Sequence, residues 1–147
     1  MLSLVSCASF NQSQSSEEKY IGKLTLFQKE KSFNYNFAIF PSENIFIIQV
    51  NKPLLGNVLN VKIDKFNGIS TSPAPDIKTV AFIKNLNLDD FFTFISNCLR
   101  SNISKNSLIS FNQDKTNFDC EKRKEMATLI TIKFENIYIK GVISDYK

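Results

Sequence analysis

The chain has 147 residues, a net charge of +4 and no histidine. A chain of this length forms one domain that buries roughly 68–70% of the surface of its unfolded form, so it can fold without cross-links. Histidine is the usual general base and the commonest metal ligand, so its absence disfavours an enzyme and a metal or cofactor site. The lysines are scattered along the sequence, which disfavours nucleic-acid binding.

The N-terminal residues end in Leu4-Val5-Ser6-Cys7, which resembles a bacterial lipobox with its lipid-bearing cysteine. A secretory signal needs roughly 7–15 apolar residues, so we expect residues 1–7 to be a truncated signal whose true start lies upstream. The alternative is an ordinary apolar N-terminus with a chance cysteine. Residues 8–19 are polar and predict a flexible tether, which favours an anchor at Cys7. Because Ala8 is not the aspartate that retains such lipoproteins at the inner membrane, the anchor implies the periplasmic face of the outer membrane.

Hydrophobic alternation with a period of two begins at Tyr20. Phe33, Tyr35 and Phe37 alternate with polar residues, and residues 45–50 form a continuous apolar run of the kind found in central strands. The pattern predicts an antiparallel meander that ends at Pro73 and Pro75. Its strands are expected at residues 20–27, 33–40, 45–50, 58–64 and, as a short fifth strand, 66–70.

Two helices are expected after the meander. The first is a short helix over residues 77–84, and the second begins near Leu88, where Asp89 and Asp90 suit a helix N-terminus. Helix capping explains this carboxylate pair better than catalysis does. A brief strand at 108–111, a loop over 112–125 and a terminal hairpin of 127–134 and 137–144 follow. The predicted fold is α+β: a curved antiparallel sheet with one or two helices against its concave face, in one domain over residues 20–147.

Cys98 and Cys120 remain when Cys7 is set aside as the anchor. In an oxidising compartment the two thiols could pair as a disulfide. They could also be two separate, small buried hydrophobic residues, and the sequence favours this second interpretation.

Two leucines stand out in the segment between the third and fourth expected strands. This segment reads Lys52-Pro53-Leu54-Leu55-Gly56, and a connection of this kind normally carries polar residues because water surrounds it. Pro53 and Gly56 favour a protruding turn that exposes the leucines. The alternative is that the loop folds back and buries Leu54 and Leu55 under the sheet.

The order of these features resembles that of the outer-membrane lipoprotein receptor LolB family. The similarity covers residues from about Tyr20 to Tyr146 and rests on order and pattern: a lipobox cysteine, a polar tether, Tyr-x-Gly-x-Leu-x-Leu, two aromatic-rich strands, Pro-Leu-Leu-Gly, a helix introduced by Leu86-Asn87-Leu88 and a closing apolar hairpin. The resemblance implies an unclosed β-barrel covered by helices, with an apolar cavity that accepts the acyl chains of other lipoproteins.

In this family a protruding loop with an exposed leucine helps to deliver the cargo to the bilayer, a role that would fall here on Leu54 or Leu55. The resemblance also implies a LolA-like periplasmic carrier as partner, acyl chains as ligand and the inner leaflet of the outer membrane as destination, with the protein expected as a monomer. The candidate cavity wall consists of Phe33, Tyr35, Phe37, Phe46, Ile48, Leu59 and Val61. For any one of these seven residues the sequence favours a place in a plain packed core. With a solid core the chain would be an anchored structural or adaptor lipoprotein without transfer activity.

Overall fold

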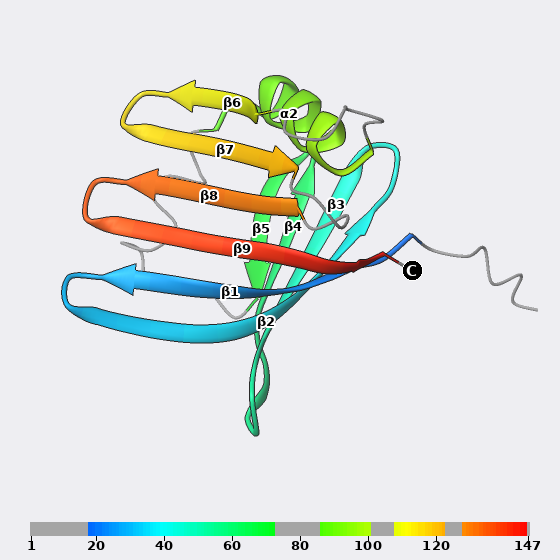
Figure 1. Ribbon diagram of the computed structural model, residues 1–147. Helices are drawn as coiled ribbons and strands as arrows, with labels where there is room; N and C mark the ends of the chain where they lie inside the picture. Colours follow the sequence, from blue (N-terminus) through cyan, green and yellow to red (C-terminus); the bar gives the residue numbers. More distant parts are fainter. Residues whose placement is uncertain (1–17, 73–85, 101–107, 123–127, 147) are drawn as a thin grey trace, which may run out of the picture.

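The protein folds into a curved sheet with one helix against its inner side (Figure 1). The computed structural model describes residues 18–72, 86–100, 108–122 and 128–146. Their strands are β1 (Tyr20–Gln28), β2 (Lys31–Pro41), β3 (Ile45–Lys52), β4 (Gly56–Asp64), β5 (Gly68–Ser72), β6 (Leu108–Gln113), β7 (Thr116–Lys122), β8 (Thr128–Phe134) and β9 (Ile137–Tyr146), and the helix is α2 (Leu88–Arg100).

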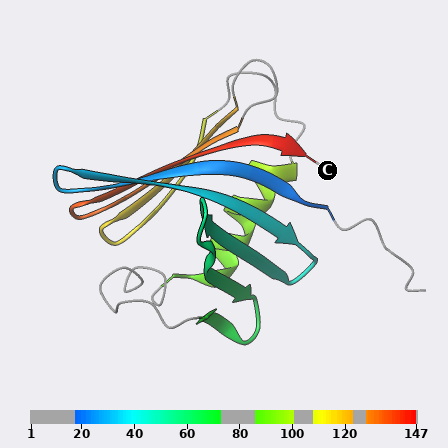
Figure 2. The ribbon, with the colours of Figure 1, turned by 90° about the horizontal axis from the view of Figure 1, so that it is seen from below.

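All strand pairs are antiparallel, in the order β5-β4-β3-β2-β1-β9-β8-β7-β6. The first strand therefore lies at the centre and joins the N-terminal meander to the C-terminal one through its pairing with β9. The two edges, β5 and β6, are not paired with each other, so the sheet stays open (Figure 2).

The prediction of an α+β fold is wrong. In the described residues, nine strands form one antiparallel sheet and a single helix of 13 residues accompanies it, so the protein is mainly β. An unclosed curved sheet with a helix against it agrees with the expectation in part. The expected helix over residues 77–84, the segment 1–7 and most of the expected tether lie outside the described residues.

Much of the difference comes from residues 112–125, which were expected to form a loop. The sixth strand continues to Gln113, and β7 occupies Thr116–Lys122 after a two-residue turn. Thr116, Phe118 and Cys120 are buried, with exposed or half-buried residues between them. The charged residues in this segment hid a strand with a period of two, because only one of its faces is apolar.

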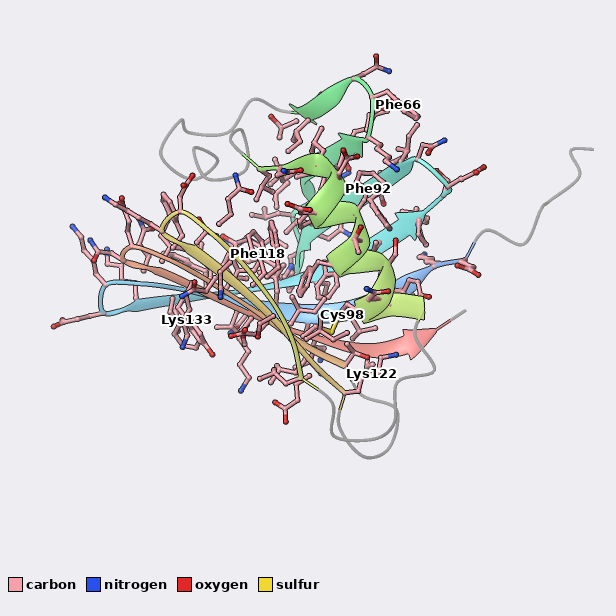
Figure 3. All side chains as sticks on the ribbon, turned by 90° about the horizontal axis from the view of Figure 1, so that it is seen from above. Phe66, Phe92, Cys98, Phe118, Lys122 and Lys133 are labelled. Atoms are coloured by element: carbon pink, nitrogen blue, oxygen red, sulfur yellow. A yellow bond between two sulfur atoms is a disulfide. The ribbon has the colours of Figure 1, made fainter. Side chains whose placement is uncertain are left out.

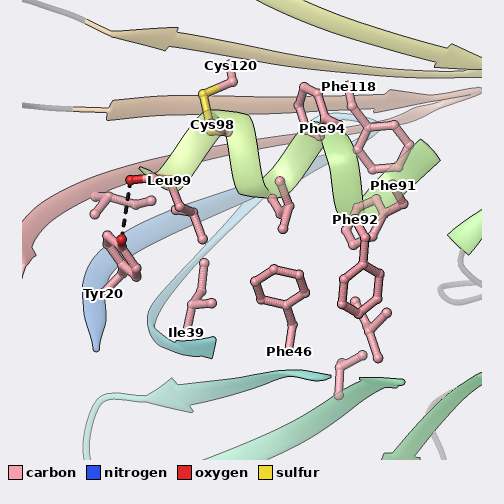
Figure 4. Close-up of a cluster of buried hydrophobic side chains, with 14 of the residues drawn as sticks. Tyr20, Ile39, Phe46, Phe91, Phe92, Phe94, Cys98, Leu99, Phe118 and Cys120 are labelled. Atoms are coloured by element: carbon pink, nitrogen blue, oxygen red, sulfur yellow. Dashed lines mark hydrogen bonds between the residues drawn. A yellow bond between two sulfur atoms is a disulfide. The ribbon is translucent and has the colours of Figure 1, made fainter. Parts of the chain in front are cut away.

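The helix packs on the sheet through aromatic side chains (Figure 4). Phe92 contacts Phe46 of β3 with ring centroids 4.7 Å apart, while Phe91 and Phe94 contact Phe118 of β7. The helix thus joins strands from the two halves of the sheet. Its start agrees with the prediction, because the N–H of Asp90 donates to Oδ1 of Asn87 at 3.3 Å as in an N-cap.

A disulfide joins Cys98 near the end of α2 to Cys120 of β7. Both cysteines are almost fully buried, as expected, but they are bonded to each other, so the interpretation favoured from the sequence, two separate buried thiols, is wrong. Nearby, the hydroxyl of Tyr20 donates to the carbonyl oxygen of Leu99 at 3.3 Å. The C-terminal part of the helix is therefore attached both to β7 and to the central strand β1.

Removing the disulfide should weaken the fold. Because the bond closes a loop with a sequence separation of 22, changing Cys98→Ala together with Cys120→Ala should lower the free energy of unfolding by about 3 kcal/mol. Urea unfolding of both proteins measures this difference. A reductant should lower the stability of the original protein to the level of the variant and leave the variant unchanged; equal stability of both proteins under oxidising conditions would contradict the assignment.

The ring of Phe37 lies beside two glycines on neighbouring strands. A Cβ atom added at Gly22 of β1 would be 2.6 Å from Cζ of Phe37 and would also collide with the carbonyl oxygen of Val142. At Gly141 of β9 the same addition would be 3.5 Å from the Phe37 ring, an ordinary contact. Gly22 is thus required for the close approach of the ring, and Gly141 is not.

The two glycines supply a matched pair for a stability test. Gly22→Ala should lower the free energy of unfolding by roughly 1–3 kcal/mol, because overpacking forces the ring or the backbone to move. Gly141→Ala should change it by less than about 1 kcal/mol, since an added methyl in a strand also restricts the unfolded chain. Similar losses in both variants, measured by urea unfolding, would show that the packing of Phe37 is not the cause.

Candidate functional site

The most exposed apolar residue of the described chain, Leu54, lies at the tip of the β3–β4 hairpin beside the exposed Leu55. The N–H of Leu55 donates to the carbonyl oxygen of Lys52 at 3.1 Å and closes the turn over residues 53–55. Leu54 is fully exposed, and Leu55 has 69% of its surface exposed. The alternative in which the loop buries its leucines is therefore wrong for this structure, and both leucines face solvent.

A β-bulge lies at the base of this hairpin. Val50 pairs with Leu59 and Asn51 with Asn57, so Val58 is one extra residue on β4. A bulge increases the local twist and bends the strand. The hairpin extends well beyond the neighbouring strand β2 (Figure 1).

The backbone at the tip is unusual for the residue that occupies it. Leu54 has a φ of +70°, in the left-handed region that leucine rarely adopts, and Gly56 has a φ of +75°, which glycine adopts freely. The conformation of Gly56 agrees with its expected role in shaping the loop. The positive φ of Leu54 and the exposure of its side chain to water both cost free energy. Such an outlier motivates a functional hypothesis.

The expected cavity residues all lie on one face of the sheet. The register of β1 to β4 places the seven residues on the face that also carries Tyr20 and Ile63 of the core cluster, which is the face that α2 covers. We call it the inner face. Three members of the set are buried in the core cluster with the helix: Phe37, Phe46 and Val61. Because Phe92 of the helix contacts Phe46, these positions belong to a packed core.

The other four expected residues lie where the helix gives less cover. Phe33 is 37% exposed, and Tyr35, Ile48 and Leu59 are half-buried. Leu59 pairs with Val50 at the base of the leucine hairpin. A partly exposed apolar surface therefore continues from the packed core towards the hairpin.

Pairing between the two ends of the chain adds residues to this surface that the sequence did not identify. Leu26 of β1 pairs with Phe33 on one side and with Ile139 on the other, and Ile139 pairs with Ile132. The half-buried apolar inner-face residues contributed by β1, β8 and β9 are Leu24, Leu26, Ile130, Ile132, Phe134, Ile137 and Ile139. Their alternation was visible in the sequence, but the β1–β9 pairing that brings them beside Phe33 was not.

Two carboxylates of the described residues, Asp64 and Asp89, have structural roles. Oδ1 of Asp64 accepts hydrogen bonds from the N–H groups of Phe66 and Asn67, at 2.9 and 3.2 Å, and Oδ2 accepts one from the side chain of Asn67. These bonds hold the pKa of Asp64 below its usual value and fix the turn between β4 and β5. Asp89 lies in the first turn of α2 with Nζ of Lys65 at 4.0 Å.

The described chain contains neither a candidate metal site nor a helix that could span a membrane. No three residues among its Cys, Asp and Glu come together as a metal site, and α2 is not long and apolar enough to cross a membrane. Cys7, the candidate lipidation site, lies outside the described residues. The candidate site therefore consists of the leucine hairpin and the partly exposed inner face beside it.

No protein-family model matches the sequence, and no curated protein matches it.

The strained leucine can be tested against its neighbour. A side chain in the left-handed region costs roughly 1–2 kcal/mol, and Leu54→Gly removes this cost. The gain offsets the conformational entropy that glycine loses on folding. Leu55→Gly has only the entropy cost, because Leu55 does not have a positive φ. The Leu54→Gly variant should therefore be more stable than the Leu55→Gly variant by about 1 kcal/mol in urea unfolding. Equal stabilities would mean that the turn relaxes and that Leu54 is not strained.

Proposed function

We propose that this protein is an outer-membrane lipoprotein that accepts lipoproteins from a periplasmic carrier, binds their acyl chains and inserts them into the membrane. The observation that carries the proposal is the pair of exposed leucines, Leu54 and Leu55, at the tip of the protruding hairpin. The resemblance to the LolB family assigns the delivery of cargo to a loop at this position.

The tip has the chemistry of a segment that enters the boundary of a bilayer. Moving a fully exposed leucine side chain into an apolar environment is worth about 1.5–3 kcal/mol, so the two leucines together favour insertion. The exposed Lys52 precedes the turn, and a lysine at this depth can keep its ammonium group among the lipid headgroups. The closed turn also spares the backbone of residues 52 and 55 from losing hydrogen bonds on insertion.

The inner face supports the second half of the proposal, the binding of acyl chains. Its partly exposed portion continues from the aromatic core in two directions, along β2 to Tyr35 and Phe33 and along β4 to Leu59 at the base of the hairpin. Each acyl methylene removed from water contributes about 0.8 kcal/mol, so a chain moves to the site that covers it best without an energy-consuming step. The hairpin beside this surface gives the chain a short route to the bilayer.

The disulfide supports the proposed location at the periplasmic face of the outer membrane. Disulfides form and persist in oxidising compartments, among them the bacterial periplasm. In this proposal a lipid on Cys7 holds the protein at the outer membrane, and residues 8–17 connect the lipid to the described domain.

The second candidate function is that of an anchored structural or adaptor lipoprotein with a solid core. The direct contact between Phe92 and Phe46 favours this alternative, because an acyl chain cannot occupy that position unless the helix moves. The two candidates differ in one measurable respect, which is the transfer of acylated cargo.

The hairpin leucines should be required for delivery. The test variant carries Leu54→Glu with Leu55→Glu in a Cys7→Ser background. It should accept a labelled lipoprotein from its carrier as the original protein does, but its delivery of the lipoprotein to vesicles should fall at least tenfold. Two carboxylates oppose insertion by more than the roughly 1.4 kcal/mol that a tenfold change requires. Release of carrier-bound label measures acceptance, and co-flotation with the vesicles measures delivery.

The matched control places the same charge change on two other exposed apolar residues. Phe66→Glu with Leu108→Glu alters side chains that are 75% and 64% exposed and lie away from the hairpin. This control should deliver cargo as the original protein does. Failure of the folded original protein to accept any label would favour the structural lipoprotein, and normal delivery by the leucine variant would remove the hairpin from the mechanism.

A further inference from the structure

The side of the sheet opposite α2, which we call the outer face, carries a diagonal row of lysines. Lys23 of β1 lies beside Val142 of β9, and Lys140 is two residues further along β9. Lys140 lies beside Thr131 of β8, and Lys133 is two residues further along β8. Diagonal neighbours of this kind are about 7–8 Å apart, so the three lysines cross three adjacent strands in regular steps.

Carboxylates lie beside this row at one end only, next to Lys133. Lys23, Lys133 and Lys140 are exposed, and none forms an ion pair in the described part of the chain. Among the residues of β2, β1, β9 and β8 whose side chains are described, the outer face carries no Asp or Glu; the side chain of Asp145 is outside that set. On the next strand, β7, Asp119 lies beside Thr131 and Glu121 beside Leu129. The centre of the outer face is therefore basic, although the net charge of the whole chain is only +4.

Aromatic side chains accompany the lysines on this face. Phe27, which is 39% exposed, contacts Tyr138 with ring centroids 5.6 Å apart, and Nζ of Lys133 lies 5.7 Å from the centre of the Tyr138 ring. Figure 3 labels Lys133 on the side of the sheet away from the helix. Near the start of β1, Nζ of Lys19 lies 5.4 Å from the centre of the Phe40 ring. Lysines beside half-exposed aromatic rings are typical of surfaces that meet lipid headgroups.

We propose that the outer face docks on the anionic headgroups of a lipid bilayer. The charge complementarity is direct, since each lysine near an anionic membrane surface contributes attraction while its stem and the neighbouring rings contact the interface. The position of the remaining chain agrees with this occupant: residues 1–17 join the described domain at Glu18, immediately before Lys19 and β1. Ten to twelve extended residues reach at most about 40 Å, so an anchor near the N-terminus would keep this face close to the bilayer.

This contact is distinct from the insertion of the leucine hairpin. The hairpin extends along the sheet rather than away from its outer face (Figure 1), so one flat bilayer cannot meet the outer face and the hairpin tip at the same time. The outer face holds the protein flat on the membrane, and the hairpin contact requires the domain to stand upright. The inference depends on a membrane location, as the proposed function does, but it does not depend on acyl transfer.

Sedimentation with vesicles tests the proposal on the full chain carrying Cys7→Ser. The protein should bind vesicles of phosphatidylcholine mixed with phosphatidylglycerol, and binding should fall steeply between low and high salt. Changing Lys23, Lys133 and Lys140 each to Gln should lower the partition coefficient roughly 100-fold, because each lysine contributes about fivefold. All three side chains are exposed, so the variant should unfold at the same urea concentration as the original protein.

A control variant removes the same total charge from other exposed positions. Lys31→Gln with Lys65→Gln and Lys115→Gln should lower binding only a few-fold, and the leucine variant Leu54→Glu with Leu55→Glu should retain the salt-dependent binding. Equal losses in the two lysine variants would overturn the proposal, as would equal binding to vesicles of pure phosphatidylcholine. Because this assay contains no cargo, a failure of lipoprotein transfer leaves its outcome unchanged, and the two proposals can fail separately.

Discussion

Burial of the inner face is the constraint on which the other features of this protein depend. A nine-stranded sheet spans roughly 38 Å across its strands, whereas a helix of 13 residues is only about 20 Å long. The aromatic residues of α2 cover the middle of the face, where Phe46 and Phe118 are almost completely buried. Away from the helix, Phe33 and Tyr35 remain partly exposed. The candidate acyl-binding surface is thus the part of the inner face for which the described helix is too short.

The attachment of the helix decides which part of the face stays uncovered. The disulfide and the hydrogen bond from Tyr20 hold the C-terminal end of α2 against β7 and β1. At its other end, the N–H of Asn87 donates to Oε1 of Gln113 at 2.7 Å and ties the helix start to β6. With both ends attached, the helix lies across the sheet. The surface near the leucine hairpin is left to contact another molecule.

The two faces of the same strands have opposite character, and they support different proposals. On β1, Leu24 belongs to the apolar inner face, while the adjacent Lys23 belongs to the basic outer face. An antiparallel sheet with one solvated side permits this division, because successive side chains point to opposite faces. In the two proposals one face binds acyl chains and the other meets charged headgroups, and neither role requires a catalytic group.

The sequence by itself determined most of the local structure. Alternation located the first five strands and the closing hairpin, and the apolar period with its acidic start located α2, because these signals depend on neighbouring residues only. It also singled out Leu54 and Leu55 as apolar residues in a turn. The sequence did not reveal β7, where charged residues masked a one-sided strand, and it favoured unpaired cysteines, because a spacing of 22 residues does not show whether two thiols meet. Only the tertiary structure paired β1 with β9, placed Phe33 beside Leu26 and Ile139, and aligned the three lysines, because each of these depends on contacts between residues far apart in the chain.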